Sequence, residues 1–213
     1  LNQKYKQLSF VTGDDFNIFK ILSVETDEVK HSKILGELLK PYGLHSQGSS
    51  FLMFFIDCLK TQLNLSNSIL ERFDSKSAKV IIEENIGAIT DDKSEGGRID
   101  IVVKDKMGNI LVIENKIYAK DQKNQLKRYK NKYPKGLLLY LTLEGNEPQL
   151  SSSVNLEENK DYFCISYKDF ILKWISQCRD SATSKPFIRE SLSQYLNTIK
   201  SLTNQSKYNN MSD

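Results

Sequence analysis

Charged side chains interrupt two apolar segments in the middle of the sequence. Asp100 lies within the run Ile99 to Val103, and Glu114 and Lys116 follow the run Leu111 to Ile113. A strand rich in apolar residues seldom carries a carboxylate unless a metal ion or a charged partner compensates it. Two carboxylates and a lysine brought together are the components of a site where a divalent metal ion assists phosphodiester hydrolysis.

The spacing of these residues predicts that they meet across a hairpin. A turn centred near Met107 places Asp100 about opposite Glu114, where two like charges repel each other. Mg²⁺ or Mn²⁺, which prefer oxygen ligands, would relieve that repulsion. Glu114 and Lys116 are two residues apart and therefore share one face of their strand, while Asn115 points away.

The same alternation predicts that Asp100 points to the face opposite Ile99 and Ile101. Each charged residue taken alone has a simpler interpretation, because an exposed strand residue or a surface ion pair would give the same local pattern. The catalytic interpretation therefore rests on the three residues as a group.

Hydrophobic periodicity predicts the elements that must position this group. Helices are expected over 16–22, 29–39 and 51–63, then strands over 80–82, 99–103 and 111–113. A helix over 121–133, strands over 137–143 and 162–165, and helices over 168–178 and 186–202 follow. Residues 87–97 are polar and contain glycine, which predicts a mobile loop. This order is typical of an α/β fold, a mixed β-sheet core flanked by helices on both faces with an N-terminal helical region.

The composition fits one domain. At 213 residues, the chain divides into an N-terminal helical part (1–75), a sheet core with the active site (76–166), C-terminal helices (167–203) and a tail (204–213). No apolar run has the length of a membrane span, so no membrane partner is expected. The N-terminus has no signal-peptide pattern, and the three dispersed cysteines predict reduced residues in a cytoplasmic protein.

A net charge of +3 is too small to indicate a nucleic-acid partner, but the basic residues are unevenly distributed. Residues 116–135 contain a single acid, Asp121, among many lysines and one arginine. Such a stripe can neutralise phosphates, although a basic helix alone is more often a solvated face. The candidate nucleic-acid-binding residues are Lys120, Lys123, Lys127 and Arg128.

Three short motifs, in order, resemble the PD-(D/E)xK nuclease superfamily. Gly97 to Asp100 is similar to the GxxD element of its RecB-like members, and Glu114 to Lys116 to the ExK element. Gln125 and Tyr129 match QxxxY on the following helix. The segment 28–32, with the pattern E-x-x-H-S, is similar to a bacterial subgroup of this superfamily.

The resemblance implies a restriction-endonuclease-like fold and a role for each matched residue. Asp100 and Glu114 would ligate Mg²⁺ or Mn²⁺, with the backbone carbonyl of Asn115 as a third ligand. Lys116 would orient or activate the attacking water and stabilise charge on the phosphate. Gln125 and Tyr129 would position water, Lys116 or the phosphate.

The resemblance also implies an additional acid. Glu28 is the candidate, and Glu25, Glu83 and Glu84 are alternatives, with Glu84 lying on the strand that precedes the hairpin. His31 and His45 are equally compatible with catalysis and with a purely structural hydrogen bond.

The sequence therefore predicts a metal-dependent nuclease, with DNA preferred over RNA, in bacterial or phage defence or in DNA processing. Two alternatives stay open: a nucleic-acid-binding module of the same fold without catalysis, and an interaction scaffold whose basic helix binds an acidic partner. Cleavage of both DNA strands would suggest a homodimer, but no sequence pattern identifies one.

Overall fold

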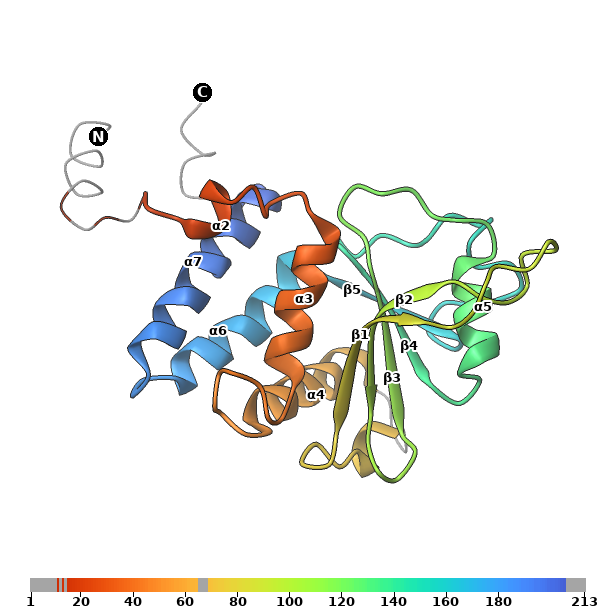
Figure 1. The fold of residues 1–213 in the computed structure, drawn as a ribbon, viewed down its shortest axis with the longest axis horizontal. Helices are drawn as coiled ribbons and strands as arrows, with labels where there is room; N and C mark the ends of the chain where they lie inside the picture. Colours follow the sequence, from red (N-terminus) through yellow and green to blue (C-terminus); the bar gives the residue numbers. More distant parts are fainter. Residues whose placement is uncertain (1–10, 12, 14, 65–68, 206–213) are drawn as a thin grey trace.

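The computed structural model, which describes residues 11, 13, 15–64 and 69–205, contains a five-stranded sheet. Its strands follow each other in space in sequence order: β1 (Lys79–Asn85), β2 (Arg98–Lys104), β3 (Ile110–Asn115), β4 (Leu137–Thr142) and β5 (Tyr162–Ser166). The first three strands pair antiparallel and the last three pair parallel. The sheet is therefore mixed, as predicted (Figure 1).

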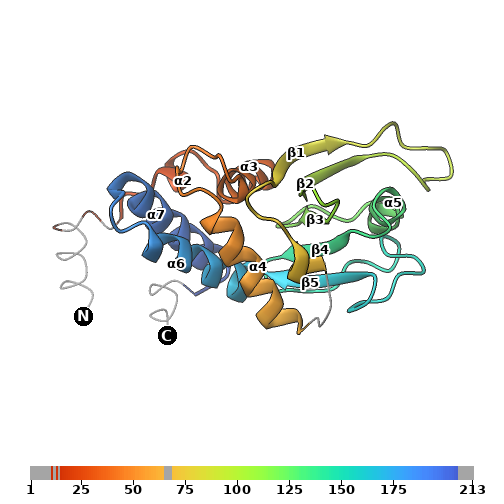
Figure 2. The same cartoon turned by 90° about the horizontal axis from the view of Figure 1, so that it is seen from below.

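Helices lie on both faces of this sheet (Figures 1 and 2). The larger group comprises α2 (Ile18–Ile21), α3 (Glu28–Leu39), α4 (Ser50–Leu63), α6 (Leu172–Ser181) and α7 (Pro186–Leu202). Helix α5 (Gln125–Lys132) lies on the other side. A 3-10 turn, η1 (Ile69–Arg72), precedes β1, and a π-helical turn, η2 (Tyr167–Ile171), leads into α6. The predicted α/β fold is confirmed.

Two apolar clusters hold these layers together. The larger one joins α3, α4, α6 and α7 to one face of the sheet, and the buried indole of Trp174 donates a 2.8 Å hydrogen bond to the Phe51 carbonyl within it. The smaller cluster packs Leu126 and Tyr129 of α5 against Val112 on the opposite face. Burial of apolar surface is the main stabilising contribution in folding. Because the two clusters cover opposite faces of the sheet, together they hold the strands and their ends in place.

Two predicted helices begin differently from the expectation. Helix α5 starts at Gln125 rather than at 121, because Asn124 is left-handed (φ 56°) and the Asp121 carboxylate accepts a hydrogen bond from the Tyr140 hydroxyl. The helix expected over 168–178 begins with the π-helical turn η2.

Residues 87–97, predicted as a loop, form a narrow hairpin that extends β1 and β2. Backbone hydrogen bonds join Gly97 N to Gly87 O and Thr90 N to Glu95 O. Gly96 and Gly97 have φ of 81° and 117°, and a Cβ on Gly96 would lie 1.9 Å from the Ala88 carbonyl oxygen. Only glycine fits there, which explains the first residue of the GxxD pattern and its neighbour.

The expected alternation along β2 is wrong at Asp100. Ile99 packs in the smaller cluster with α5, whereas Ile101 packs in the larger cluster on the opposite face. On the neighbouring strand, Glu83 lies between the register pairs that contain these two isoleucines and is left-handed, with φ of 57°. The backbone is irregular at this point of the strand pair, so simple alternation does not hold.

The predicted tail lies, apart from residues 204 and 205, outside the described residues. Within the described part of the chain, no helix combines the length and apolarity needed to cross a membrane.

Candidate active site

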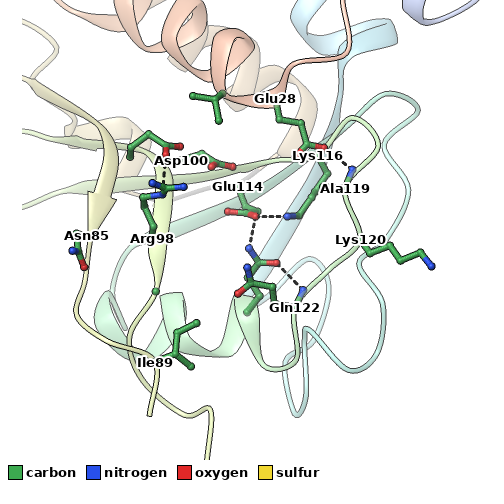
Figure 3. A pocket seen from close by; sticks show the side chains of 14 residues that line it. Glu28, Asn85, Ile89, Arg98, Asp100, Glu114, Lys116, Ala119, Lys120 and Gln122 are labelled. Carbon is green, nitrogen blue, oxygen red and sulfur yellow. Dashed lines mark hydrogen bonds and ion pairs between the residues drawn. The ribbon is translucent and has the colours of Figure 1, made fainter. Parts of the chain in front are cut away.

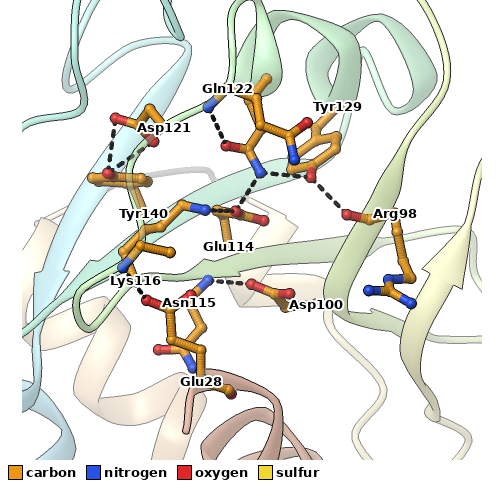
Figure 4. Close-up of polar contacts among 12 residues, drawn as sticks. Glu28, Arg98, Asp100, Glu114, Asn115, Lys116, Asp121, Gln122, Tyr129 and Tyr140 are labelled. Carbon is orange, nitrogen blue, oxygen red and sulfur yellow. Dashed lines mark hydrogen bonds and ion pairs between the residues drawn. The ribbon is translucent and has the colours of Figure 1, made fainter. Parts of the chain in front are cut away.

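Asp100, Glu114 and Lys116 lie together where β2 and β3 approach helix α5 (Figure 4). Ile101 pairs with Ile113, so the register places Asp100 opposite Glu114, as predicted. The Asn115 backbone N–H donates to Asp100 Oδ2 at 2.7 Å, and Lys116 Nζ lies 2.9 Å from Glu114 Oε1. The hairpin therefore brings the three charged groups into one site.

The Asn115 side chain points the other way and anchors the strand. Its Nδ2 donates to the Glu28 carbonyl at 3.1 Å and to Ser32 Oγ at 3.0 Å. Its Oδ1 accepts a 2.9 Å hydrogen bond from the Tyr167 hydroxyl. These bonds tie the end of β3 to α3 and η2, and they leave the backbone carbonyl of Asn115 as the atom for the predicted metal-ligand role.

Helix α5 positions the site through Gln125 and Tyr129. Gln125 Nε2 donates to Glu114 Oε1 at 2.6 Å and to the Tyr129 hydroxyl at 3.1 Å, while its Oε1 accepts from Gln122 N. The Tyr129 hydroxyl donates to the Arg98 carbonyl at 2.6 Å. Both side chains are buried, and they orient Glu114 and the start of β2.

Glu28, at the start of α3, reaches the same site. Its Oε1 accepts hydrogen bonds from the backbone N–H groups of Ile117, Tyr118 and Ala119, at 2.7, 2.9 and 2.8 Å. One carboxylate oxygen therefore fixes the segment that directly follows Lys116. Glu28 also lines the pocket that contains Asp100 and Glu114.

This pocket has a volume of about 480 Å³ and is lined by charged residues from three parts of the chain (Figure 3). Glu28 comes from α3, Glu83 and Arg98 come from the first two strands, and Lys120 from the segment between β3 and α5. This volume is within the usual range of ligand pockets and leaves ample room for a phosphate group.

Burial and mutual repulsion disfavour two charged carboxylates at this site. Burial raises the pKa of Asp100 to about 6, against the opposing hydrogen bond from Asn115 N. Burial, and then the neighbouring charge of Asp100, raise the pKa of Glu114 well above its ordinary value. Without a bound metal ion, and even beside Lys116, the pair holds a proton in preference to two charges.

Burial favours the neutral amine of Lys116, but the opposing charge and hydrogen bond of Glu114 leave its pKa raised overall. Lys116 is therefore an ammonium ion in this arrangement. An ammonium can stabilise developing negative charge but cannot accept a proton from water.

The donor set fits a divalent cation. Glu114 Oε2 is buried, and no hydrogen-bond partner reaches it from the described residues. A buried carboxylate oxygen without a partner is unfavourable, and coordination to a cation would satisfy it. Among the described residues no cluster of three His, Cys, Asp or Glu side chains could hold a metal ion. Two carboxylates therefore need the Asn115 carbonyl and water to complete the oxygen shell of Mg²⁺ or Mn²⁺.

The prediction of Arg128 as a nucleic-acid-binding residue needs correction. Its side chain is 2% exposed and donates to the carbonyls of Gly96 and Lys123 and to Gln122 Oε1. The guanidinium holds the glycine hairpin against α5 and cannot reach a phosphate. Lys120 and Lys123 are exposed and Lys127 is half-buried, so these three are accessible.

The alternative candidates for the additional acid, Glu84, Glu83 and Glu25, lie in different surroundings. Glu84 pairs with Lys104 Nζ at 2.7 Å and accepts a 2.8 Å hydrogen bond from the Tyr133 hydroxyl, and it does not line the pocket. Glu83 does line the pocket. The Glu25 backbone carbonyl contacts His31 Nε2 at 3.2 Å.

Both histidines have structural surroundings. His31 is fully buried, its Nδ1 lies 2.8 Å from the Tyr195 hydroxyl, and burial lowers its pKa to about 4. His45 Nε2 lies 2.9 Å from the Lys40 carbonyl, and its ring stacks on Phe51. Neither histidine lines the pocket.

A comparison with known protein families agrees with this geometry. A sequence model described as the PD-(D/E)XK nuclease superfamily matches residues 16–197, which is most of the chain. The chain belongs to this superfamily. Its five-stranded mixed sheet is consistent with the restriction-endonuclease-like fold. The RecB-like pattern and the bacterial subgroup stay predictions. Searches of curated proteins and of solved structures give no match.

Sequence reasoning missed two contributors to the site. Arg98 lines the pocket, and its place within the GxxD motif, two residues before Asp100, was an available signal. Tyr167 holds Asn115 from 52 residues away, and nothing local in the sequence indicates that contact.

Proposed function

We propose that this chain is a divalent-metal-dependent nuclease that hydrolyses phosphodiester bonds, with DNA as the preferred substrate. The observation that carries the proposal is the facing pair of Asp100 and Glu114 beside the Lys116 ammonium, with Glu114 Oε2 buried and unsatisfied within the described residues. Membership of a nuclease superfamily supports the same reaction.

Asp100, Glu114 and the Asn115 carbonyl would hold the metal ion. When bound, such an ion polarises the phosphate and lowers the pKa of a coordinated water. Lys116 stabilises the negative charge that develops on the phosphate oxygens. Gln125 and Tyr129 keep Glu114 and the start of β2 in place, and Glu28 keeps the segment after Lys116 in place.

Lys120, Lys123 and Lys127 would contact the substrate backbone outside the pocket. Lysines beside the pocket add affinity for the phosphate backbone without reading the base sequence. The preference for DNA and a role in bacterial or phage defence or DNA processing rest on the resemblance to the PD-(D/E)xK superfamily. The three cysteines form no disulfide, which supports a reducing cytoplasmic location.

The proposal is tested by incubating the protein with plasmid DNA, linear DNA and RNA, each with Mg²⁺, Mn²⁺ or EDTA, beside Lys116→Ala. Metal-dependent cleavage that is lost in the variant supports the nuclease and its site together. Nicked or linear plasmid identifies an endonuclease, and degradation of linear DNA alone identifies an end-directed enzyme.

Measuring DNA binding over a range of salt concentrations beside this cleavage assay separates the alternatives. Strongly salt-dependent DNA binding without cleavage under any condition would favour the nucleic-acid-binding module, because released counterions make phosphate contacts sensitive to salt. Absence of both binding and cleavage would favour the interaction scaffold. Cleavage of RNA alone would retain the reaction and overturn the preferred substrate.

A further inference from the structure

Two charged residues of the pocket have no part in the chemistry described above. Arg98, at the start of β2, and Glu83, on β1, both line the pocket. Arg98 Nε lies 2.8 Å from Glu83 Oε2, which makes the two residues an ion pair. This pair faces the same cavity as Lys116, from the first two strands.

The backbone of Arg98 is fixed while its side chain is open. The Arg98 carbonyl accepts the hydrogen bond from the Tyr129 hydroxyl, and Arg98 pairs with Asn85 of β1 in the sheet. The side chain, in contrast, is 64% exposed. A guanidinium presents five N–H donors in a plane that matches a phosphate, and here the contact to Glu83 is made through Nε.

Glu83 occupies an unusual backbone position. It is left-handed (φ 57°) in the middle of a strand, where a non-glycine residue is strained. Strained residues that line a pocket commonly have a functional reason. Its charge also faces Asp100 and contributes to raising the pKa of that carboxyl.

We propose that Arg98 binds the substrate phosphate that enters this pocket, and that Glu83 holds the guanidinium until the phosphate replaces it. The inference rests on the proposed function and adds a substrate-binding residue to it. Solvent screens this pair at the mostly exposed Arg98, although Glu83 is only 20% exposed, and a bidentate contact between the guanidinium and a phosphate can replace it. The phosphate would then lie between Arg98 and Lys116, two cations on either side of the carboxylates.

The test measures binding of a fluorescently labelled DNA duplex by anisotropy in EDTA, over a range of salt concentrations. The variants are Arg98→Ala, Arg98→Lys and Glu83→Gln. Arg189→Ala and Glu190→Gln are matched controls, because Arg189 and Glu190 form a comparable exposed ion pair at 3.0 Å on α7. Circular dichroism establishes that each variant is folded.

Arg98→Ala is expected to weaken binding about tenfold and to reduce the slope of log K against log salt by about 0.9, the value for one lost phosphate contact. Arg98→Lys should keep the slope and lose part of the affinity, because an ammonium lacks the planar fork. Glu83→Gln should strengthen binding severalfold, since the competing charge is removed. The two controls should bind like the wild type.

Unchanged affinity and slope in Arg98→Ala, or no binding by the wild type, would overturn the inference. Weaker binding by Glu83→Gln would show that the pair is structural, and loss of metal-dependent cleavage in that variant would place Glu83 in the metal site. If Arg98→Ala does not fold, Arg98→Lys and Glu83→Gln decide. Binding that changes as expected in a protein that never cleaves would sustain this inference while the proposed function fails.

Discussion

Gln125 and Lys116 meet on the same oxygen atom of Glu114. The Gln125 amide donates to Oε1 at 2.6 Å, and the Lys116 ammonium lies 2.9 Å from it. Two donors on one oxygen fix the carboxylate and leave Oε2, the buried atom without a partner among the described residues, as the one available to a cation. Through the bond from Gln125, helix α5 with its QxxxY residues therefore orients Glu114, a candidate metal ligand.

The first prediction concerns the orientation of Glu114 by Gln125. Gln125→Leu removes the amide donor, so Glu114 loses its fixed orientation while the charged groups stay present. The metal concentration for half-maximal cleavage should rise about 10- to 100-fold, as for other residues that orient metal ligands. A titration of cleavage rate with Mg²⁺ measures it. Gln149→Ala, on an exposed loop, is the control. If Gln125→Leu has the same Mg²⁺ dependence of cleavage as the wild type, Gln125 does not orient Glu114 for metal binding.

The second prediction separates two roles of Glu28. A carboxylate that only accepts N–H bonds from Ile117, Tyr118 and Ala119 can be replaced by an amide oxygen. Glu28→Gln should therefore keep cleavage within about threefold of wild type, while Glu28→Ala should lose about 10- to 100-fold because Lys116 is displaced. Steady-state kinetics of both variants decide. Equal losses in both would show that the charge itself is required, as for an additional catalytic acid.

A third prediction tests the corrected role of Arg128. Arg128→Ala leaves the buried Gly96 carbonyl and two partly buried acceptors without their bonds and opens a cavity beside α5, so the free energy of unfolding should fall by about 3 kcal/mol. Lys123→Ala, on the same segment but exposed, should change it by less than about 0.5 kcal/mol. Urea unfolding provides both values. A stable Arg128→Ala with weakened DNA binding would restore the original assignment to the phosphate-binding surface.

A fourth prediction follows from His31. Burial lowers its pKa from 6.5 to about 4, so the unfolded chain takes up a proton in that interval and the folded chain does not. This contribution to stability is therefore complete above about pH 6.5 and falls as the pH drops towards about 4, by roughly 3 kcal/mol in total.

His31→Gln should lack this component, so its stability should fall less than that of the wild type between about pH 7 and about pH 4.5. Urea unfolding at both pH values measures the difference. The charged or titratable neighbours of His31 are Tyr195, Tyr167, Asp27 and Glu28. Parallel pH dependence in the two proteins would show that His31 titrates normally.

The sequence was sufficient to predict the central group because a short turn determines it. The Asp105 carboxylate accepts from the N–H groups of Met107 and Asn109, which closes the β2–β3 hairpin and sets the register. Asp100 and Glu114 then face each other without help from distant parts of the chain.

The remaining features depend on contacts that no local pattern contains. Arg128 and Lys127 are adjacent in a basic stripe, and only the approach of the Gly96 hairpin makes one of them buried. The bonds from Glu28 to the segment after β3 join residues about 90 positions apart and require α3 to pack on the sheet. The left-handed backbone of Glu83 in the middle of β1 has no signal in the local sequence.

The most direct test of the metal-dependent nuclease is DNA cleavage by Glu114→Gln beside Glu84→Gln, each with Mg²⁺ and with EDTA. Glu84 is a matched control because it is also paired with a lysine at the sheet but lies outside the pocket. The wild type and Glu84→Gln should cleave DNA only with Mg²⁺, and Glu114→Gln should be slower by about 1,000-fold or more. Cleavage by Glu114→Gln at the wild-type rate would contradict the account.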